Sequence, residues 1–187
     1  MPHAVDRLLA ALGLLVLSPV LLAFAIWIKL DSRGPVIYRQ LRVGKDGHTF
    51  EMLKLRTMKE GSDPVGVGTA VGQGDPRVTK PGELMRRTSI DEIPNLVNVL
   101  RGEMALVGPR PALPAHLDYF DIHGHPRFDV LPGITGWAQV KGRADITWPE
   151  RVELDDWYVT HRTPALDLRI IGMTILPVLK GEGVSPE

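Results

Sequence analysis

The sequence predicts a small α+β protein, mostly helical and with a short β-hairpin, that is anchored to a membrane through its N-terminal segment. Three observations predict this class: a long uncharged apolar run near the N-terminus, two strand-like segments on either side of a glycine-containing turn, and two helical stretches near the C-terminus. We expect residues 1–30 to form a re-entrant membrane helix and residues 31–187 to form the cytoplasmic catalytic domain.

Length and composition narrow the class further. The chain has 187 residues, a formal net charge of zero and no cysteine, which suits one domain with a real core. The lack of cysteine excludes a disulfide scaffold, a cysteine-ligated metal site and a thiol nucleophile. The balanced charge argues against a strongly basic nucleic-acid-binding protein. Residues 29–59 are nevertheless basic, with eight Lys or Arg against three Asp or Glu. This favours contact with a membrane surface or with phosphate groups.

The apolar run covers residues 8–28, reads LLAALGLLVLSPVLLAFAIWI and is bracketed by Arg7 and Lys29. As a helix it is about 31 Å long, enough to cross the hydrocarbon core of a bilayer. Three interpretations are open: a signal peptide cleaved after Ala25, a plain spanning anchor, and a re-entrant helix broken at Ser18 and Pro19 that enters and leaves through one face. The basic residues after the run place the following domain on the cytoplasmic side, but they do not place the N-terminus.

Short elements separated by loops are expected in the first half of the domain. Strands are predicted at residues 36–38 and 49–53, and a turn at residues 44–47 joins them. A glycine-rich loop at residues 61–76 precedes a helix at residues 82–87.

A capping-box pattern predicts the next helix. Ser89 and Glu92 have the required spacing, so we expect a helix from there to about Leu100, with Gly102 as its stop and Pro94 as a local cost. The rest of the chain is expected to form an extended segment, a turn-rich loop and two helices, at residues 107–114, 132–136, 149–161 and 164–180. The last helix is apolar on most faces, which suits the core or an interfacial position at the lipid boundary.

Two adjacent carboxylates and a set of basic residues are the candidates for chemistry. Asp91 and Glu92 suit the start of a helix, but they also suit a carboxylate nucleophile beside a second acid–base or metal-binding carboxylate. Arginine forks bind phosphate oxygens, although a lone arginine is more often a solvated surface charge. Arg110 is distinct because Pro109 and Pro111 fix the backbone around it, so its side chain is held at a low entropy cost. The other basic candidates are Lys54, Arg56, Arg86 and Arg143.

The stretch RRTSIDEIPNLVNVLRGEMALVGPRP at residues 86–111 resembles the signature of the bacterial sugar transferase family, the monotopic phosphoglycosyl transferases that act on polyprenol phosphate. Four further blocks occur in the expected order, so the resemblance covers nearly the whole chain: KLRTM (54–58), DPRVT (75–79), PGITGWAQVKGR (132–143) and LDDWYV (154–159). The departures remove no charged group: Ile90, Ile93, Asn95, Val97 and Glu103 stand where the family more often has Leu, Leu, Gln, Trp and Asp.

The resemblance implies a reaction in the bacterial cytoplasmic membrane, the inner membrane. A phosphosugar passes from a nucleotide sugar, usually a UDP-sugar, to a polyprenol phosphate such as undecaprenyl phosphate, and UMP is released. In the family the first carboxylate of the pair is the covalent nucleophile and a Mg²⁺ ligand, which is Asp91 here, and Glu92 is its acid–base companion. Lys54 and Arg110 are the expected phosphate contacts, Arg56, Arg86 and Arg143 are weaker candidates, and Asp155 matches the acidic position of its block.

The resemblance also implies a role in assembling a polysaccharide or another glycan. The sequence identifies neither the sugar nor the pathway, and it leaves open whether the protein is a homodimer. One alternative function remains, a membrane-anchored scaffold that holds lipid phosphate through its basic segment without catalysis.

Overall fold

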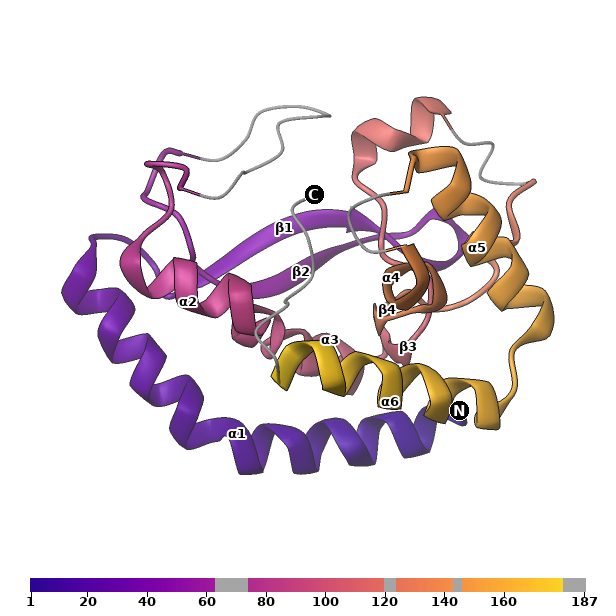
Figure 1. Ribbon diagram of the computed structural model, residues 1–187, viewed down its shortest axis with the longest axis horizontal. Coiled ribbons are helices and arrows are strands. Elements are labelled where there is room, and N and C mark those ends of the chain that lie inside the picture. The colour runs from indigo at the N-terminus through magenta and orange to yellow at the C-terminus, as the bar shows by residue number, and fades with distance from the viewer. Residues whose placement is uncertain (63–73, 120–123, 143–145, 180–187) are drawn as a thin grey trace.

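The computed structural model describes residues 1–62, 74–119, 124–142 and 146–179. A long N-terminal helix runs beneath a mixed domain that is built from short helices and two small sheets (Figure 1). The α-helices are α1 (His3–Asp31), α2 (Lys80–Thr88), α3 (Asn95–Arg101), α4 (Trp137–Gly142), α5 (Trp148–His161) and α6 (Pro164–Leu179). The strands are β1 (Ile37–Val43), β2 (Thr49–Leu55), β3 (Ala105–Val107) and β4 (Gly133–Thr135). The mostly helical α+β class is therefore confirmed.

The predicted hairpin is present and longer than expected. β1 pairs antiparallel with β2 from Ile37 opposite Leu55 to Val43 opposite Thr49. Asp46 and Gly47 have φ values of 54° and 76°, so two left-handed residues help to reverse the chain between the strands. The sequence analysis ended the first strand too early because the charged residues that follow obscured its apolar alternation.

A second sheet was not predicted. β3 and β4 form a two-stranded parallel pair in which Ala105 is opposite Gly133 and Val107 is opposite Thr135. Each strand has only three residues, which is too short for a period-two pattern to be recognised. The pair also holds the chain just before Arg110, because Gly108 N–H donates to the Thr135 carbonyl and Gly133 N–H donates to the Pro109 carbonyl, each at 2.9 Å.

Helix α1 bends near its middle, close to Pro19 (Figure 1). The Ser18 hydroxyl donates to the carbonyl of Leu15 at 2.8 Å, so it compensates in part for the backbone bond that proline removes. Ala10 lies in a core cluster with Phe50 and Val99, whereas Ile28, near the other end of α1, lies in a separate cluster with β2 and α2 residues. Both ends of the helix therefore pack against the same domain.

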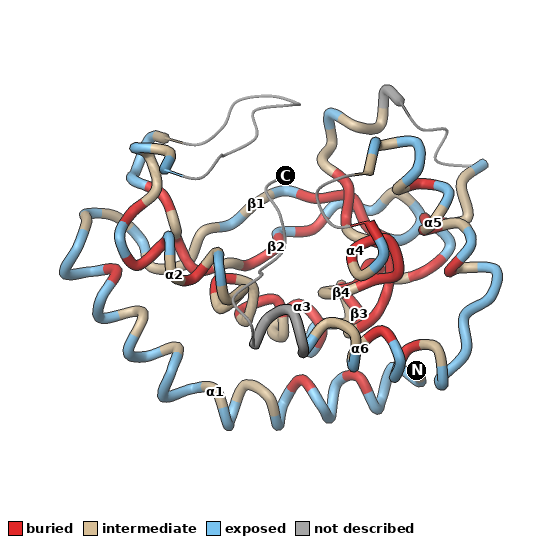
Figure 2. The backbone as a smooth tube through the Cα atoms, viewed as in Figure 1, coloured by how far each residue is buried: buried red, intermediate tan, exposed pale blue. Residues whose placement is uncertain are grey.

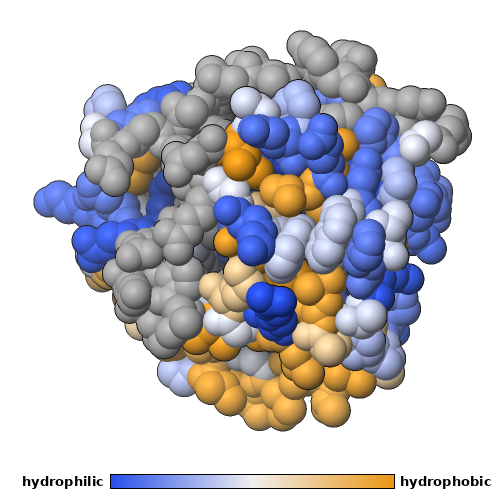
Figure 3. Space-filling view, turned by 45° about the vertical axis from the view of Figure 1, so that its right-hand side comes forward, coloured by the Kyte–Doolittle hydropathy of each residue, from blue (hydrophilic) through white to orange (hydrophobic). Residues whose placement is uncertain are grey.

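The outward face of α1 is apolar and exposed. Leu15 and Val16 are 71% and 72% exposed, and Leu30 is 81% exposed. Figure 2 shows that the buried residues concentrate in the domain, on β2, β3 and α4, while most of α1 remains open. Figure 3 shows apolar side chains gathered along the lower edge of this face, and mainly hydrophilic side chains on its right-hand side above them. α1 is also long and apolar enough to cross a membrane by length and composition.

The capping box expected at Ser89 does not form. Ser89 has a left-handed backbone with φ 56°, whereas an N-cap needs an extended one. The chain instead makes a short 3-10 turn, η2 (Ile90–Glu92), and α3 begins only at Asn95. The Glu92 side chain is engaged with cations from other elements. The end of the helix was predicted correctly, since Gly102 terminates it with φ 79°.

The two C-terminal helices lie close to their expected ranges. α5 begins with a complete capping box between Thr147 and Glu150. Asp167 of α6 is only 2% exposed and accepts a hydrogen bond of 2.7 Å from the Tyr158 hydroxyl of α5. This bond joins the two helices, and the N-terminal amine of Met1 also pairs with Asp167.

Candidate active site

Glu92 is the centre of a compact charged cluster. Its Oε1 atom lies 3.1 Å from Lys54 Nζ and 2.9 Å from Arg110 Nη2. The three side chains are 12–13% exposed and come from η2, β2 and the loop after β3. Burial alone would raise the pKa of Glu92, but Arg110 and Lys54 overcome this and hold it at about 2. Glu92 is therefore a carboxylate that keeps two cations together.

Asp91 has the opposite electrostatic environment. It is 8% exposed, and burial together with the adjacent charge of Glu92 raises its pKa to about 7, against the influence of Lys54 and Arg86. Leaving a charge at such a position is unfavourable unless a cation or a hydrogen-bond donor meets it. The adjacent carboxylates thus differ in role: one already has its cations, and the other is suited to receive a ligand.

The donor set fits a magnesium ion only with help from a substrate. Mg²⁺ prefers carboxylate and phosphate oxygens and retains several waters. Asp91 supplies one such carboxylate, and the described residues contain no cluster of three or more His, Cys, Asp or Glu side chains suited to a metal. An ion at Asp91 would therefore complete its shell with phosphate oxygens and water.

Lys54 is placed by a buried amide that the sequence analysis did not single out. Asn98 of α3 is fully buried, and its side chain accepts a 3.1 Å hydrogen bond from Leu53 N–H and donates one of 2.7 Å to the carbonyl of Glu51. The amide thus binds the backbone of β2 next to Lys54. An asparagine in an amphipathic helix has no sequence signal that distinguishes this contact from a surface position.

Some predicted site residues lie elsewhere. Arg56 is 6% exposed and its guanidinium binds the carbonyls of Arg33 and Ser32 just after α1, so it is engaged in fixing that helix end. Asp155 is 1% exposed on α5 and pairs with Arg127 at 3.4 Å. Arg86 lies near enough to lower the pKa of Asp91. Arg143 falls outside the described residues.

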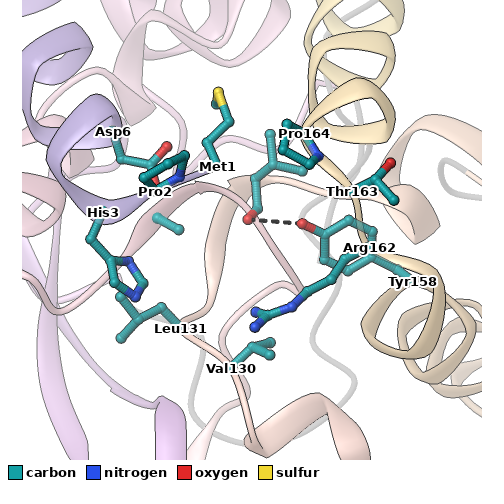
Figure 4. Close-up of a pocket in the computed structure, with 12 residues that line it drawn as sticks. Met1, Pro2, His3, Asp6, Val130, Leu131, Tyr158, Arg162, Thr163 and Pro164 are labelled. Atoms are coloured by element: carbon teal, nitrogen blue, oxygen red, sulfur yellow. Dashed lines mark hydrogen bonds between the residues drawn. The ribbon is translucent and has the colours of Figure 1, made fainter.

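Two cavities lie away from this cluster, at the N-terminal end of α1. Their volumes are about 260 and 440 Å³, and they share lining residues that include Asp6 and Arg162. Figure 4 shows Arg162 pointing toward the space between His3 and Tyr158 in the smaller one. Neither lining includes Asp91, Glu92, Lys54 or Arg110. These cavities are therefore separate from the charged cluster.

Comparison with known proteins identifies related sequences. The uncharacterized sugar transferase EpsL of Bacillus subtilis is 42% identical over 178 residues, which is 95% of this chain and 87% of that protein. The UDP-glucose:undecaprenyl-phosphate glucose-1-phosphate transferase of Escherichia coli is 44% identical over 181 residues, which cover 39% of its length. A UDP-N-acetylgalactosamine-undecaprenyl-phosphate N-acetylgalactosaminephosphotransferase of Aeromonas hydrophila is 41% identical over 44% of its length. The family model for bacterial sugar transferases matches residues 1–181, and the chain therefore belongs to the bacterial sugar transferase family.

Proposed function

We propose that this protein transfers a phosphosugar from a UDP-sugar to undecaprenyl phosphate or a related polyprenol phosphate, through a covalent intermediate on Asp91. The observation that carries the proposal is the buried carboxylate pair, in which Glu92 gathers Lys54 and Arg110 beside Asp91. The names of the relatives support the two substrates, since several act on undecaprenyl phosphate and a UDP-sugar.

The reaction needs two displacements at one phosphorus atom. In the first, a carboxylate oxygen of Asp91 bonds to the phosphorus that bears the sugar, the bond to the second phosphate breaks, and UMP leaves. In the second, a phosphate oxygen of the polyprenol phosphate bonds to the same phosphorus and the Asp91 carboxylate is released. Covalent capture allows a soluble donor and a lipid acceptor to use one site in turn.

Positive charge near Asp91 reduces the repulsion between its carboxylate and the diphosphate of the donor. Lys54 and Arg110 lie at hydrogen-bond distance from Glu92 and are suited to bind the diphosphate oxygens. When bound through Asp91, Mg²⁺ would supply further charge neutralisation at the phosphates. Because its pKa is held at about 2, Glu92 is better suited to orient these cations than to transfer a proton.

The membrane helix fits the re-entrant interpretation best. Ala10 and Ile28, near opposite ends of α1, both lie in the core of the same domain, so a straight crossing would pull one end away from its contacts. Cleavage after Ala25 would likewise remove Ala10 from the core. A bent helix with an exposed apolar middle would rest in the cytoplasmic leaflet and keep the catalytic domain at the headgroups of the inner membrane.

The deciding experiment separates this enzyme from a non-catalytic scaffold. Purified protein is incubated with Mg²⁺ and UDP-sugars, without acceptor, and is examined by intact mass and by released UMP. We expect a mass increase of one phosphosugar with an active donor and about one equivalent of UMP. Asp91→Asn should give neither, because the amide is not nucleophilic, and EDTA should suppress both in the wild type.

Asp46→Asn is the matched control, since Asp46 is an exposed turn residue whose left-handed backbone asparagine tolerates. It should behave like the wild type. An Asp91→Asn protein that transfers phosphosugar at the normal rate would refute the assignment. Binding of polyprenol phosphate without turnover of any UDP-sugar would favour the scaffold.

A further inference from the structure

The backbone of the Arg110 loop is held at four successive carbonyl groups. Proline has no N–H, so at positions 109 and 111 the carbonyl is the only backbone group that can form a hydrogen bond. The carbonyls from 109 to 112 each accept a bond, and the donors come from three parts of the chain: β4, η4 and the end of β1. The pairs are Pro109 O with Gly133 N at 2.9 Å, Arg110 O with Arg127 Nη2 at 2.8 Å, Pro111 O with Arg42 Nη1 at 3.0 Å, and Ala112 O with Val43 N at 2.8 Å.

The bond to the carbonyl of Arg110 itself comes from a buried arginine. Arg127 belongs to the 3-10 turn η4 (Pro126–Phe128), and its side chain is 1% exposed. The same Nη2 atom lies 3.4 Å from Asp155 Oδ2 on α5, whose side chain is 2% exposed. A chain of contacts thus runs from α5 through Arg127 to the backbone of Arg110, and from the Arg110 guanidinium to Glu92.

A contribution to folding stability is a poor explanation for the presence of the buried Arg127–Asp155 pair. Removing both charges from water is costly, and well-packed apolar residues often replace a buried ion pair without loss of stability. Burial raises the pKa of Asp155 to about 6 even though Arg127 opposes the shift, so the carboxylate is ionised at a net cost. The contact to a backbone carbonyl in the charged site gives the pair a function that stability does not.

We propose that Arg127, held by Asp155, is a positioning residue that fixes the Arg110 backbone so that the Arg110 guanidinium meets Glu92 and the donor phosphates. The inference rests on the proposed function, because it assigns Arg110 a phosphate contact. Arg127 acts through the main chain and touches no substrate. It also assigns a role to Asp155, which the sequence associated with the site although its carboxylate lies behind the loop.

The test separates positioning from stability with a double substitution. Arg127→Met/Asp155→Leu removes both buried charges and keeps apolar volume, so the fold should lose no thermal stability. The kcat for transfer should nevertheless fall by about tenfold to a hundredfold, with a smaller change in KM, because a displaced cation is less effective in the transition state. The matched control is Arg39→Met/Glu51→Leu, which removes an exposed pair on the hairpin and should leave kcat unchanged.

A double-mutant cycle with Arg110→Ala identifies the route of the effect. If Arg127 acts through Arg110, Arg110→Ala should cost much less in the Arg127→Met/Asp155→Leu background than in the wild type. If Arg110→Ala instead lowers kcat by the same factor in both backgrounds, the two effects are independent and the inference is overturned. Wild-type kcat in Arg127→Met/Asp155→Leu would also overturn it. Either result would leave the proposed function intact. An Arg110→Ala protein with normal activity would overturn both the inference and the phosphate contact assigned to Arg110, while the Asp91 intermediate is tested separately by Asp91→Asn.

Asp155→Asn provides a second route that keeps the size of the side chain. It leaves Arg127 in place without its carboxylate, so kcat should fall while Arg110→Ala again adds little. Circular dichroism and thermal unfolding of each variant establish that the compared proteins are folded. A folded Asp155→Asn protein with wild-type kcat would contradict the role of the pair.

Discussion

At the scale of single residues, the site depends on how two adjacent carboxylates differ. Glu92 is neutralised by Lys54 and Arg110, whereas the pKa of Asp91 is raised by burial and by the charge of Glu92. Adjacent residues in a helical turn point in different directions. Glu92 can therefore pair with the two cations while Asp91 remains directed elsewhere, as the proposed attack on phosphorus requires. The same geometry explains why Glu92 is not available to cap a helix.

Arg110 offers a prediction at this scale. Arg110→Lys keeps the positive charge, but a lysine is a point donor and cannot make the two parallel bonds of a guanidinium. We expect kcat/KM to fall by at least about tenfold, equivalent to roughly 1.4 kcal/mol of transition-state stabilisation, with little change in unfolding temperature. Steady-state kinetics with a UDP-sugar and polyprenol phosphate measure the effect. Wild-type kinetics in Arg110→Lys would show that charge alone suffices.

At the scale of elements, the proposed re-entrant position of α1 would set where the site lies relative to lipid. Its exposed apolar middle needs a hydrocarbon environment, and its two buried ends need the domain. Pro19 and the hydrogen bond from Ser18 to Leu15 allow one helix to meet both needs by bending. Arg56, which binds the carbonyls just after the helix, fixes the point where the chain re-enters the domain.

A prediction follows for the bend. Ser18→Ala/Pro19→Leu should straighten α1 into a segment long enough to span, and the weak charge before it would not retain the N-terminus in the cytoplasm. The chain has no cysteine, so His3→Cys gives a single reporter for an impermeant thiol reagent in intact cells. We expect no labelling when the rest of the chain is wild type, and labelling together with lower activity in the straightened variant.

Lysed cells provide the control for that experiment, since both proteins should label once the membrane is opened. Labelling of the His3→Cys protein from outside, with Ser18 and Pro19 in place, would rule out re-entry. The plain spanning anchor would then be restored.

At the scale of the whole molecule, the buried pair behind the Arg110 loop makes stability depend on pH. The pKa of Asp155 is raised to about 6 from an ordinary value of 3.8 by burial, against Arg127 and Arg151 and together with Asp156. The folded protein therefore holds this proton more tightly than the unfolded chain. The stability contributed by the protonated form is complete below about pH 3.8 and is lost as the pH rises through about 6.

Arg127→Met/Asp155→Leu lacks this titration, so its unfolding midpoint should rise relative to the wild type between pH 5 and 7.5. The gain should be a few degrees, at about 2–4 °C for each kcal/mol in a domain of this size. Thermal unfolding in detergent at several pH values measures it, and Arg39→Met/Glu51→Leu should show no such trend because its charges are exposed. A midpoint difference that stays constant with pH would show that Asp155 does not titrate in this range.

The sequence by itself determined the elements whose signals are local. The hairpin, the apolar helix with its bend near Pro19, the Gly102 stop and the two C-terminal helices follow from periodicity, turn residues and caps within a few positions of each other. The block around Asp91 and Arg110 could likewise be recognised from the sequence, because its residues lie close together in the chain.

Tertiary structure alone decided which of these residues meet. Lys54, Glu92 and Arg110 are brought together across 18 or more positions, and Arg127 reaches Arg110 from a separate turn. The three-residue strands β3 and β4, the αL backbone at Ser89 and the buried amide of Asn98 likewise have no local pattern. Such contacts depend on topology and on how burial shifts each charge, and spacing along the chain encodes neither.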